Sequence, residues 1–77
     1  MISVHIAFDP TAPFIRAVEC VANRTEAAAV YARALADGRT NWGRLNRAIL
    51  QRWTFSGLEF IKQRAWAIVE RDAEVKT

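Results

Sequence analysis

Hydrophobic and polar positions alternate with a period of two at the start of the chain. The apolar side chains on one side of this segment are Ile2, Val4, Ile6 and Phe8. A period of two is typical of a half-buried β-strand. Pro10 and Pro13 end the pattern, because proline cannot donate a hydrogen bond to a neighbouring strand. The pattern predicts a strand over residues 1–9, with an extended arm packed on the helices as the alternative.

No second strand pattern follows this segment in the sequence, so a strand here would have unpaired edges within one chain. Pairing with the same segment of a second copy would supply the missing hydrogen bonds and form a two-stranded ribbon. We therefore expect a homodimer whose interface includes Val4 and Ile6.

From residue 13 onward, the apolar residues recur at the three- and four-residue spacing of helices. The pattern predicts a helix pair over residues 13–38. A change of phase indicates a break near Asn23, with Thr25 as the N-cap of the second helix. Gly38 is expected to end this pair, because glycine favours the left-handed conformation that follows many helices.

A second helix pair is predicted over residues 41–72. Its first helix is expected to run from Trp42 to Trp53, with Thr40 or Asn41 as its N-cap. The stretch 54–57, TFSG, interrupts the pattern, and Ser56 is expected to cap the next helix.

These elements predict a mainly α fold. We expect one domain over residues 1–77, a small bundle of about four helices with an N-terminal strand, and a frayed tail over residues 73–77. The inward positions expected from the helical spacing are Phe14, Val18, Val21, Ala22, Ala28, Tyr31, Ala32, Leu35, Trp42, Leu45, Ile49, Leu50, Trp53, Leu58, Ile61, Ala65, Ile68 and Val69.

Positive charge is concentrated in one part of the chain. The 77 residues have a formal net charge of +3 and are 52% hydrophobic, which is typical of a globular domain. Within residues 39–64, six basic residues stand against Glu59 alone, a local balance of +5. A basic segment of this kind indicates an anionic partner.

The predicted helix 42–53 carries polar side chains on one side, Arg44, Arg47 and Gln51, at positions i, i+3 and i+7. Arginine matches the geometry of phosphate, so this stripe is a candidate nucleic-acid contact. The further residues expected to contribute are Arg39, Lys62, Gln63 and Arg64. The alternative is a basic helix face that is simply solvated.

Two helices joined by a short turn within residues 41–72 resemble a helix-turn-helix, or the last two helices of a homeodomain-like bundle. In those families the second helix of the pair lies in the major groove. The resemblance implies a non-catalytic nucleic-acid-binding protein, with DNA preferred over RNA as the partner.

The order of strand, helix, turn and helix at the N-terminus also resembles the ribbon-helix-helix dimers that bind DNA. In this chain ISVHIAF would be the ribbon, and Ser3, His5 and Ala7 would be its outward residues. Those families usually have longer basic or amide side chains at such positions. The resemblance therefore implies the topology more than a ribbon that reads bases.

A protein-interaction module, such as a small inhibitor or assembly adaptor, is the alternative function. Phe60 lies away from the expected core side of the last helix and Trp66 lies at its rim, and tryptophan is enriched in interfaces. These two residues and the edge of the predicted strand would form the contact surface.

The sequence contains no motif specific to an enzyme. Cys20 is the one cysteine, so no intramolecular disulfide is possible, and with one histidine no zinc-ligand pattern appears. We expect neither catalysis nor a cofactor. The chain shows no signal sequence and no apolar run of about 20 residues, so we expect a cytoplasmic protein with no membrane contact.

Overall fold

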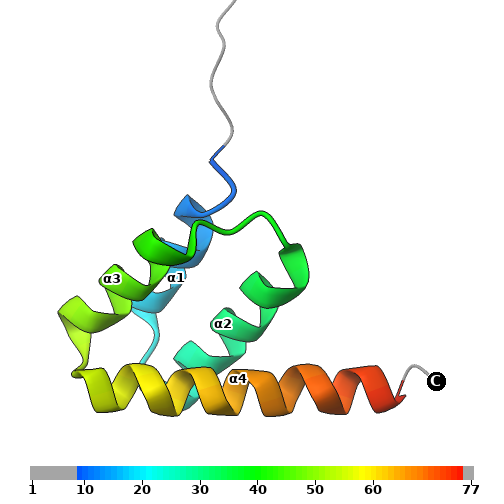
Figure 1. Cartoon of the computed structure of the whole chain (residues 1–77). Helices are drawn as coiled ribbons and strands as arrows, with labels where there is room; N and C mark the ends of the chain where they lie inside the picture. The colour runs from blue at the N-terminus through cyan, green and yellow to red at the C-terminus, as the bar shows by residue number, and fades with distance from the viewer. Residues whose placement is uncertain (1–8, 76–77) are drawn as a thin grey trace, which may run out of the picture.

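The structure is a computed structural model of the whole chain, and it describes residues 9–75 (Figure 1). The four helices in this range are α1 (Ala12–Cys20), α2 (Arg24–Asp37), α3 (Trp42–Arg52) and α4 (Phe55–Val75). The prediction of a mainly helical fold is confirmed. The predicted strand and its interface residues Val4 and Ile6 lie outside the described residues, apart from Asp9, which is in no regular element.

The first three helices lie on one side of the long helix α4 (Figure 1). Helix α2 packs against both α1 and α4, and α3 packs against α1 and α4. The C-terminal part of α4 extends past α2 (Figure 1). The helix also continues to Val75, beyond residue 72, where we expected fraying to begin.

Side chains and a glycine fix the ends of the first helices. Asn23, and not the predicted Thr25, is the N-cap of α2, and its side chain accepts a hydrogen bond from the Glu26 N–H at 3.0 Å. The Glu26 carboxylate in turn accepts from the Ala22 N–H at 2.6 Å. Gly38 has a φ of 78°, so the predicted left-handed end of α2 is confirmed.

The junction between α3 and α4 is shorter than predicted. Only Trp53 and Thr54 separate the two helices, whereas the sequence indicated a four-residue interruption over 54–57. The expected cap residue is also wrong. Ser56 lies inside α4, and the Thr54 hydroxyl accepts a hydrogen bond from the Gly57 N–H at 3.4 Å. Asn41 caps α3, as one of the two predicted alternatives.

Most of the predicted core positions are buried or partly buried. The buried apolar residues are Val18, Ala27, Ala28, Val30, Tyr31, Ala32, Ala34, Leu45, Ala48, Ile49, Leu58, Ile61 and Ala65. Ala22 and Leu50 are exposed, so those two predictions are wrong. Leu50 follows the buried Ile49, and one residue turns a helix by about 100°, which carries Leu50 away from the core.

Helix α2 has a wider buried surface than its amphipathic pattern predicted. Three further residues, Ala27, Val30 and Ala34, are buried because α1 and α4 both cover this helix. Tyr31 also contacts α3, where its ring lies 5.0 Å from that of Trp42 and its hydroxyl bonds to the Asn46 side-chain oxygen at 3.1 Å.

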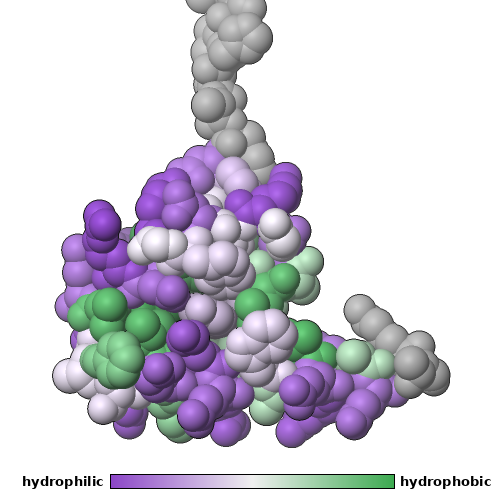
Figure 2. Space-filling view, viewed as in Figure 1, coloured by the Kyte–Doolittle hydropathy of each residue, from purple (hydrophilic) through white to green (hydrophobic). Residues whose placement is uncertain are grey.

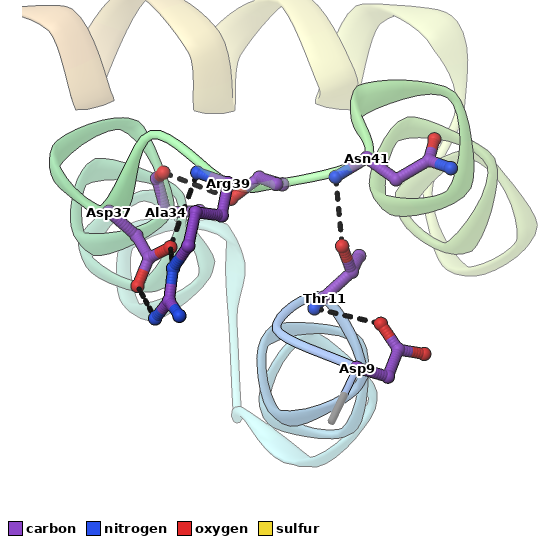
Figure 3. Close-up of polar contacts among 7 residues, drawn as sticks. Asp9, Thr11, Ala34, Asp37, Arg39 and Asn41 are labelled. Atoms are coloured by element: carbon purple, nitrogen blue, oxygen red, sulfur yellow. Dashed lines mark hydrogen bonds and ion pairs between the residues drawn. The ribbon is translucent and has the colours of Figure 1, made fainter. Parts of the chain in front are cut away.

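Hydrogen bonds connect both ends of α1 to α3. At the first end, Thr11 is only 1% exposed, and its hydroxyl accepts a hydrogen bond from the Asn41 N–H at 2.8 Å (Figure 3). Its own N–H donates to Asp9 at 3.0 Å. At the other end, Arg52 donates from Nη1 to the Val18 carbonyl at 2.9 Å. These contacts hold α1 and α3 side by side.

Candidate nucleic-acid interface

The predicted stripe on α3 is exposed, but carboxylates accompany it. Arg44, Arg47 and Gln51 line one shallow pocket beside α1, and Glu19 of α1 lines the same pocket. Arg44 forms an ion pair with Asp9, with Nη1 and Oδ2 2.8 Å apart. Hydrogen bonding from Arg44 lowers the pKa of the Asp9 carboxyl below its ordinary value. This surface therefore offers less net positive charge than the sequence indicated.

Two other predicted cations also have carboxylate partners. Arg39 forms a two-point ion pair with Asp37, with N···O distances of 3.0 and 3.1 Å (Figure 3). The hydrogen bond from Arg39 lowers the pKa of Asp37. Lys62 lies 3.8 Å from the Glu59 carboxylate. Among the described residues, Arg47 and Arg64 are the predicted cations with no ion-pair partner within 4.0 Å.

The outward side of α4 is poorly suited to a DNA groove. Gln63, Glu70 and Glu74 are all exposed, and their spacing of seven and four residues places them on one ridge of the helix. If this ridge entered a DNA groove, the carboxylates of Glu70 and Glu74 would repel the phosphates on either side of it. The short α3–α4 junction and this ridge both depart from the helix-turn-helix resemblance.

An open cleft lies at the junction of α3 and α4, where the start of α2 also approaches. Its volume is about 440 Å³, and its lining consists of Arg24, Leu50, Gln51, Arg52, Trp53, Thr54 and Gly57. None of these described lining residues carries a carboxylate. The cleft is thus a positively charged site, whereas the pocket beside α1 combines both signs of charge.

A glycine allows the chain to pack closely at this cleft. A Cβ atom at Gly57 would lie 2.7 Å from the Cβ of Trp53 and 3.5 Å from the Cδ of Arg24. Real Cβ atoms do not approach a carbon that closely, so only glycine fits without a shift. Gly57 therefore lets Trp53 and Arg24 lie against the first turn of α4.

Arginine and aromatic side chains alternate around the cleft. The guanidinium carbon of Arg52 lies 4.5 Å from the centroid of the Trp53 ring, and that of Arg24 lies 5.1 Å from the Phe60 centroid. These are cation–π distances. Arg52 uses one donor for the Val18 carbonyl, and guanidinium has five. Both arginines therefore retain donors for an anion.

The surface around the cleft continues along α4 through Phe60, which is 39% exposed beneath Arg24. Phe55 is 67% exposed, but it does not line the cleft, and its position two residues before Gly57 places it on the opposite side of the helix. Arg64 follows Phe60 by four residues, which places the two on the same side of the helix. An arginine thus extends the surface beyond the cleft itself.

Arg24 and Arg52 were not among the site residues predicted from the sequence, and Trp53 was predicted to be a core residue. Trp53 is partly buried and packs against the core, and it also lines the cleft. The alternation of arginine and aromatic residues in the stretch QRWTF was a usable signal. No local signal joined Arg24 to this stretch, because it is distant in sequence.

Phe60 and Trp66 are both exposed, but they do not form one surface. They are six positions apart in the sequence, which places them about 120° apart around α4. Phe60 lies beneath Arg24, whereas Trp66 lies on the side of α4 that carries Val69. The two residues therefore belong to different contact surfaces.

The fold and this cleft define a small all-helical domain with a cationic, aromatic surface. No protein-family model matches the chain, and no curated protein or solved structure is similar enough to count as a match. Within residues 9–75, no helix combines the length and apolar character that crossing a bilayer requires. In the same range, no three histidine, cysteine or acidic side chains gather as metal ligands.

Proposed function

We propose that the protein is a non-catalytic nucleic-acid-binding protein whose contact surface is the cleft between α3 and α4. The observation that supports this most is the lining of the cleft, which combines two arginines and a tryptophan with no carboxylate. The proposed contact surface still includes the basic helix pair 41–72 that was expected from the sequence. It is centred on Arg24, Arg52 and Trp53, however, and not on the stripe of Arg44, Arg47 and Gln51.

Single-stranded nucleic acid fits this surface better than a duplex. Proteins that bind single strands combine cationic side chains along the backbone with aromatic rings on which bases stack. Trp53 in the cleft and Phe60 beneath Arg24 supply rings for stacking. Arg24 and Arg52 line the cleft, where they can contact phosphates. A duplex read by α4 would instead meet Glu70 and Glu74.

Fluorescence anisotropy with labelled strands of about twelve nucleotides tests this proposal. We expect binding at about 50 mM salt that weakens as salt rises, because phosphate contacts release counterions. Replacing Arg24 or Arg64 with alanine should weaken binding about fivefold. Each change should also flatten the salt slope by about 0.7. DNA and RNA strands are compared directly, with DNA expected to bind at least as well.

Two variants make the anisotropy experiment specific to the cleft. Phe60→Ala should weaken binding at least about fivefold through lost stacking, and Phe60 is 39% exposed and outside the buried core. Arg47→Ala is the matched control, because Arg47 is exposed and without an ion pair among the described residues but lies beside Glu19. It should leave affinity nearly unchanged. Absence of binding, or a larger loss for Arg47→Ala than for Arg24→Ala, would contradict the proposal.

A protein-interaction module is the second candidate function. The specific observation in its favour is Trp66, which is 51% exposed beside an apolar groove on the other side of α4. Such a surface need not compete with the nucleic-acid cleft, because the two lie on different sides of the helix.

A further inference from the structure

An apolar groove separates α2 from the C-terminal half of α4. Its volume is about 490 Å³, and its lining consists of Ala29, Ala32, Arg33, Ala36, Ile68, Val69, Asp72 and Ala73. Figure 2 shows hydrophobic residues where α2 approaches this half of α4. Six of the eight lining residues are apolar, so the groove is a surface on which burial would be favourable.

The groove is open because α4 extends past α2 (Figure 1). The α2 side presents only alanines and one arginine, which would let another helix approach closely. Trp66, Val69 and Ala73 follow the spacing i, i+3 and i+7, so the exposed tryptophan lies on the same side of α4 as the groove. A large aromatic side chain beside an apolar groove is typical of an interface.

The two charged residues of the groove have opposite signs. Arg33 comes from α2 and Asp72 from α4, and both are exposed. They form no ion pair with each other within 4.0 Å, nor with any other described residue. A partner that complements this groove must therefore carry one anionic and one cationic group beside an apolar surface.

A second copy of the same groove has this composition. In a two-fold dimer, both chains contribute the same surface to the interface, so Arg33 of each chain can face Asp72 of the other. The Arg33–Asp72 pair would form twice, once on each side of the axis, and the apolar residues would be buried between the two pairs. We propose that the α2–α4 groove is the site at which two copies of this chain associate.

This interface is distinct from the strand pairing that the sequence led us to expect. It needs no residue outside residues 9–75, and it leaves the cleft between α3 and α4 accessible in each copy. The proposal does not depend on nucleic-acid binding, since its residues are not those of the cleft.

Sedimentation equilibrium of the full chain tests the proposal. The wild type should show a species of twice 8.7 kDa that dissociates on dilution. Arg33→Glu and Asp72→Arg should each raise the dissociation constant at least about tenfold, because each creates two like-charge contacts across the axis. Trp66→Ala should raise it by a similar factor. Circular dichroism confirms that each variant is folded.

Mixing the two charge variants is the decisive step. When an Arg33→Glu chain meets an Asp72→Arg chain, the introduced carboxylate faces the introduced guanidinium, and the native Asp72 of the first chain faces the native Arg33 of the second. Both contacts are attractive again, so an equimolar mixture should recover association close to that of the wild type. The double variant should recover it as well. Arg47→Glu is the control for charge reversal on another surface. A wild type that stays monomeric, or a mixture that fails to recover, would overturn the proposal.

Discussion

Replacing Thr11 with valine tests the hydrogen bond between the start of α1 and the start of α3. Valine keeps the shape of threonine but removes the hydroxyl that accepts the Asn41 N–H at 2.8 Å. Thr11 is 1% exposed, so water has poor access to the atom that is lost. The Thr11 hydroxyl makes no capping bond to α1, which means that the substitution leaves the helix start itself unchanged.

The expected size of the effect follows from two opposing contributions. Leaving the Asn41 N–H, which is in a part-buried position, without its acceptor costs about 1 to 3 kcal/mol. The added methyl group contributes about 0.8 kcal/mol in the opposite direction, because it is buried. The lost hydrogen bond therefore outweighs the methyl group, and we expect a net destabilisation of about 1 kcal/mol. For a domain of this size that corresponds to a fall in Tm of about 4 to 8 °C.

Urea denaturation followed by circular dichroism measures the free energy of unfolding, and amide hydrogen exchange identifies its source. Thr11→Ser is the control, because it keeps the hydroxyl and loses only the methyl group. Exchange at the Asn41 amide should accelerate in Thr11→Val and stay slow in Thr11→Ser relative to the global stability of each variant. A Thr11→Val protein as stable as the wild type, with unchanged exchange at the Asn41 amide, would show that this hydrogen bond does not stabilise the fold.

Two further predictions concern the cleft and the N-terminal ion pair. Gly57→Ala should destabilise the protein, because the added Cβ would lie 2.7 Å from the Cβ of Trp53. Gly43→Ala should instead stabilise it by about 0.5 to 1 kcal/mol, because the added Cβ would meet only one side-chain oxygen, at 3.5 Å. Thermal unfolding of both variants measures these effects. The pKa of Asp9 should lie below 3.8, so its contribution to stability is present above that pH and is lost as pH falls through the lowered pKa. An NMR titration in which Arg44→Gln leaves the Asp9 pKa unchanged would contradict the ion pair.

The helices were predictable because their signals are local. The spacing of Leu45, Ile49 and Trp53 identified α3, and Gly38 identified the end of α2 with its positive φ. The predicted Ser56 cap was wrong because no local signal distinguishes two neighbouring candidates. Thr54 and Ser56 are both good caps, and the choice depends on where Trp53 packs, which the sequence does not specify.

The candidate site was less predictable, because charge pairing is a tertiary property. The basic stripe on α3 looked unopposed in sequence, yet Asp9 reaches Arg44 from 35 positions earlier in the chain. The cleft likewise depends on α2 and α4 meeting, since only then does Arg24 approach Phe60. Composition indicated a cationic surface, and packing determined which cations remain available.

The three tryptophans provide the most direct measurement of the proposed function. Their indole N–H signals report separately on the core beside Tyr31 (Trp42), the cleft (Trp53) and the α2–α4 groove (Trp66). An NMR titration with a single-stranded oligonucleotide, at constant protein concentration, should shift the Trp53 signal and leave those of Trp42 and Trp66 in place. A Trp53 signal that does not move, while the amides around Arg44 and Arg47 do, would place binding on the α3 stripe and contradict the assignment of the cleft.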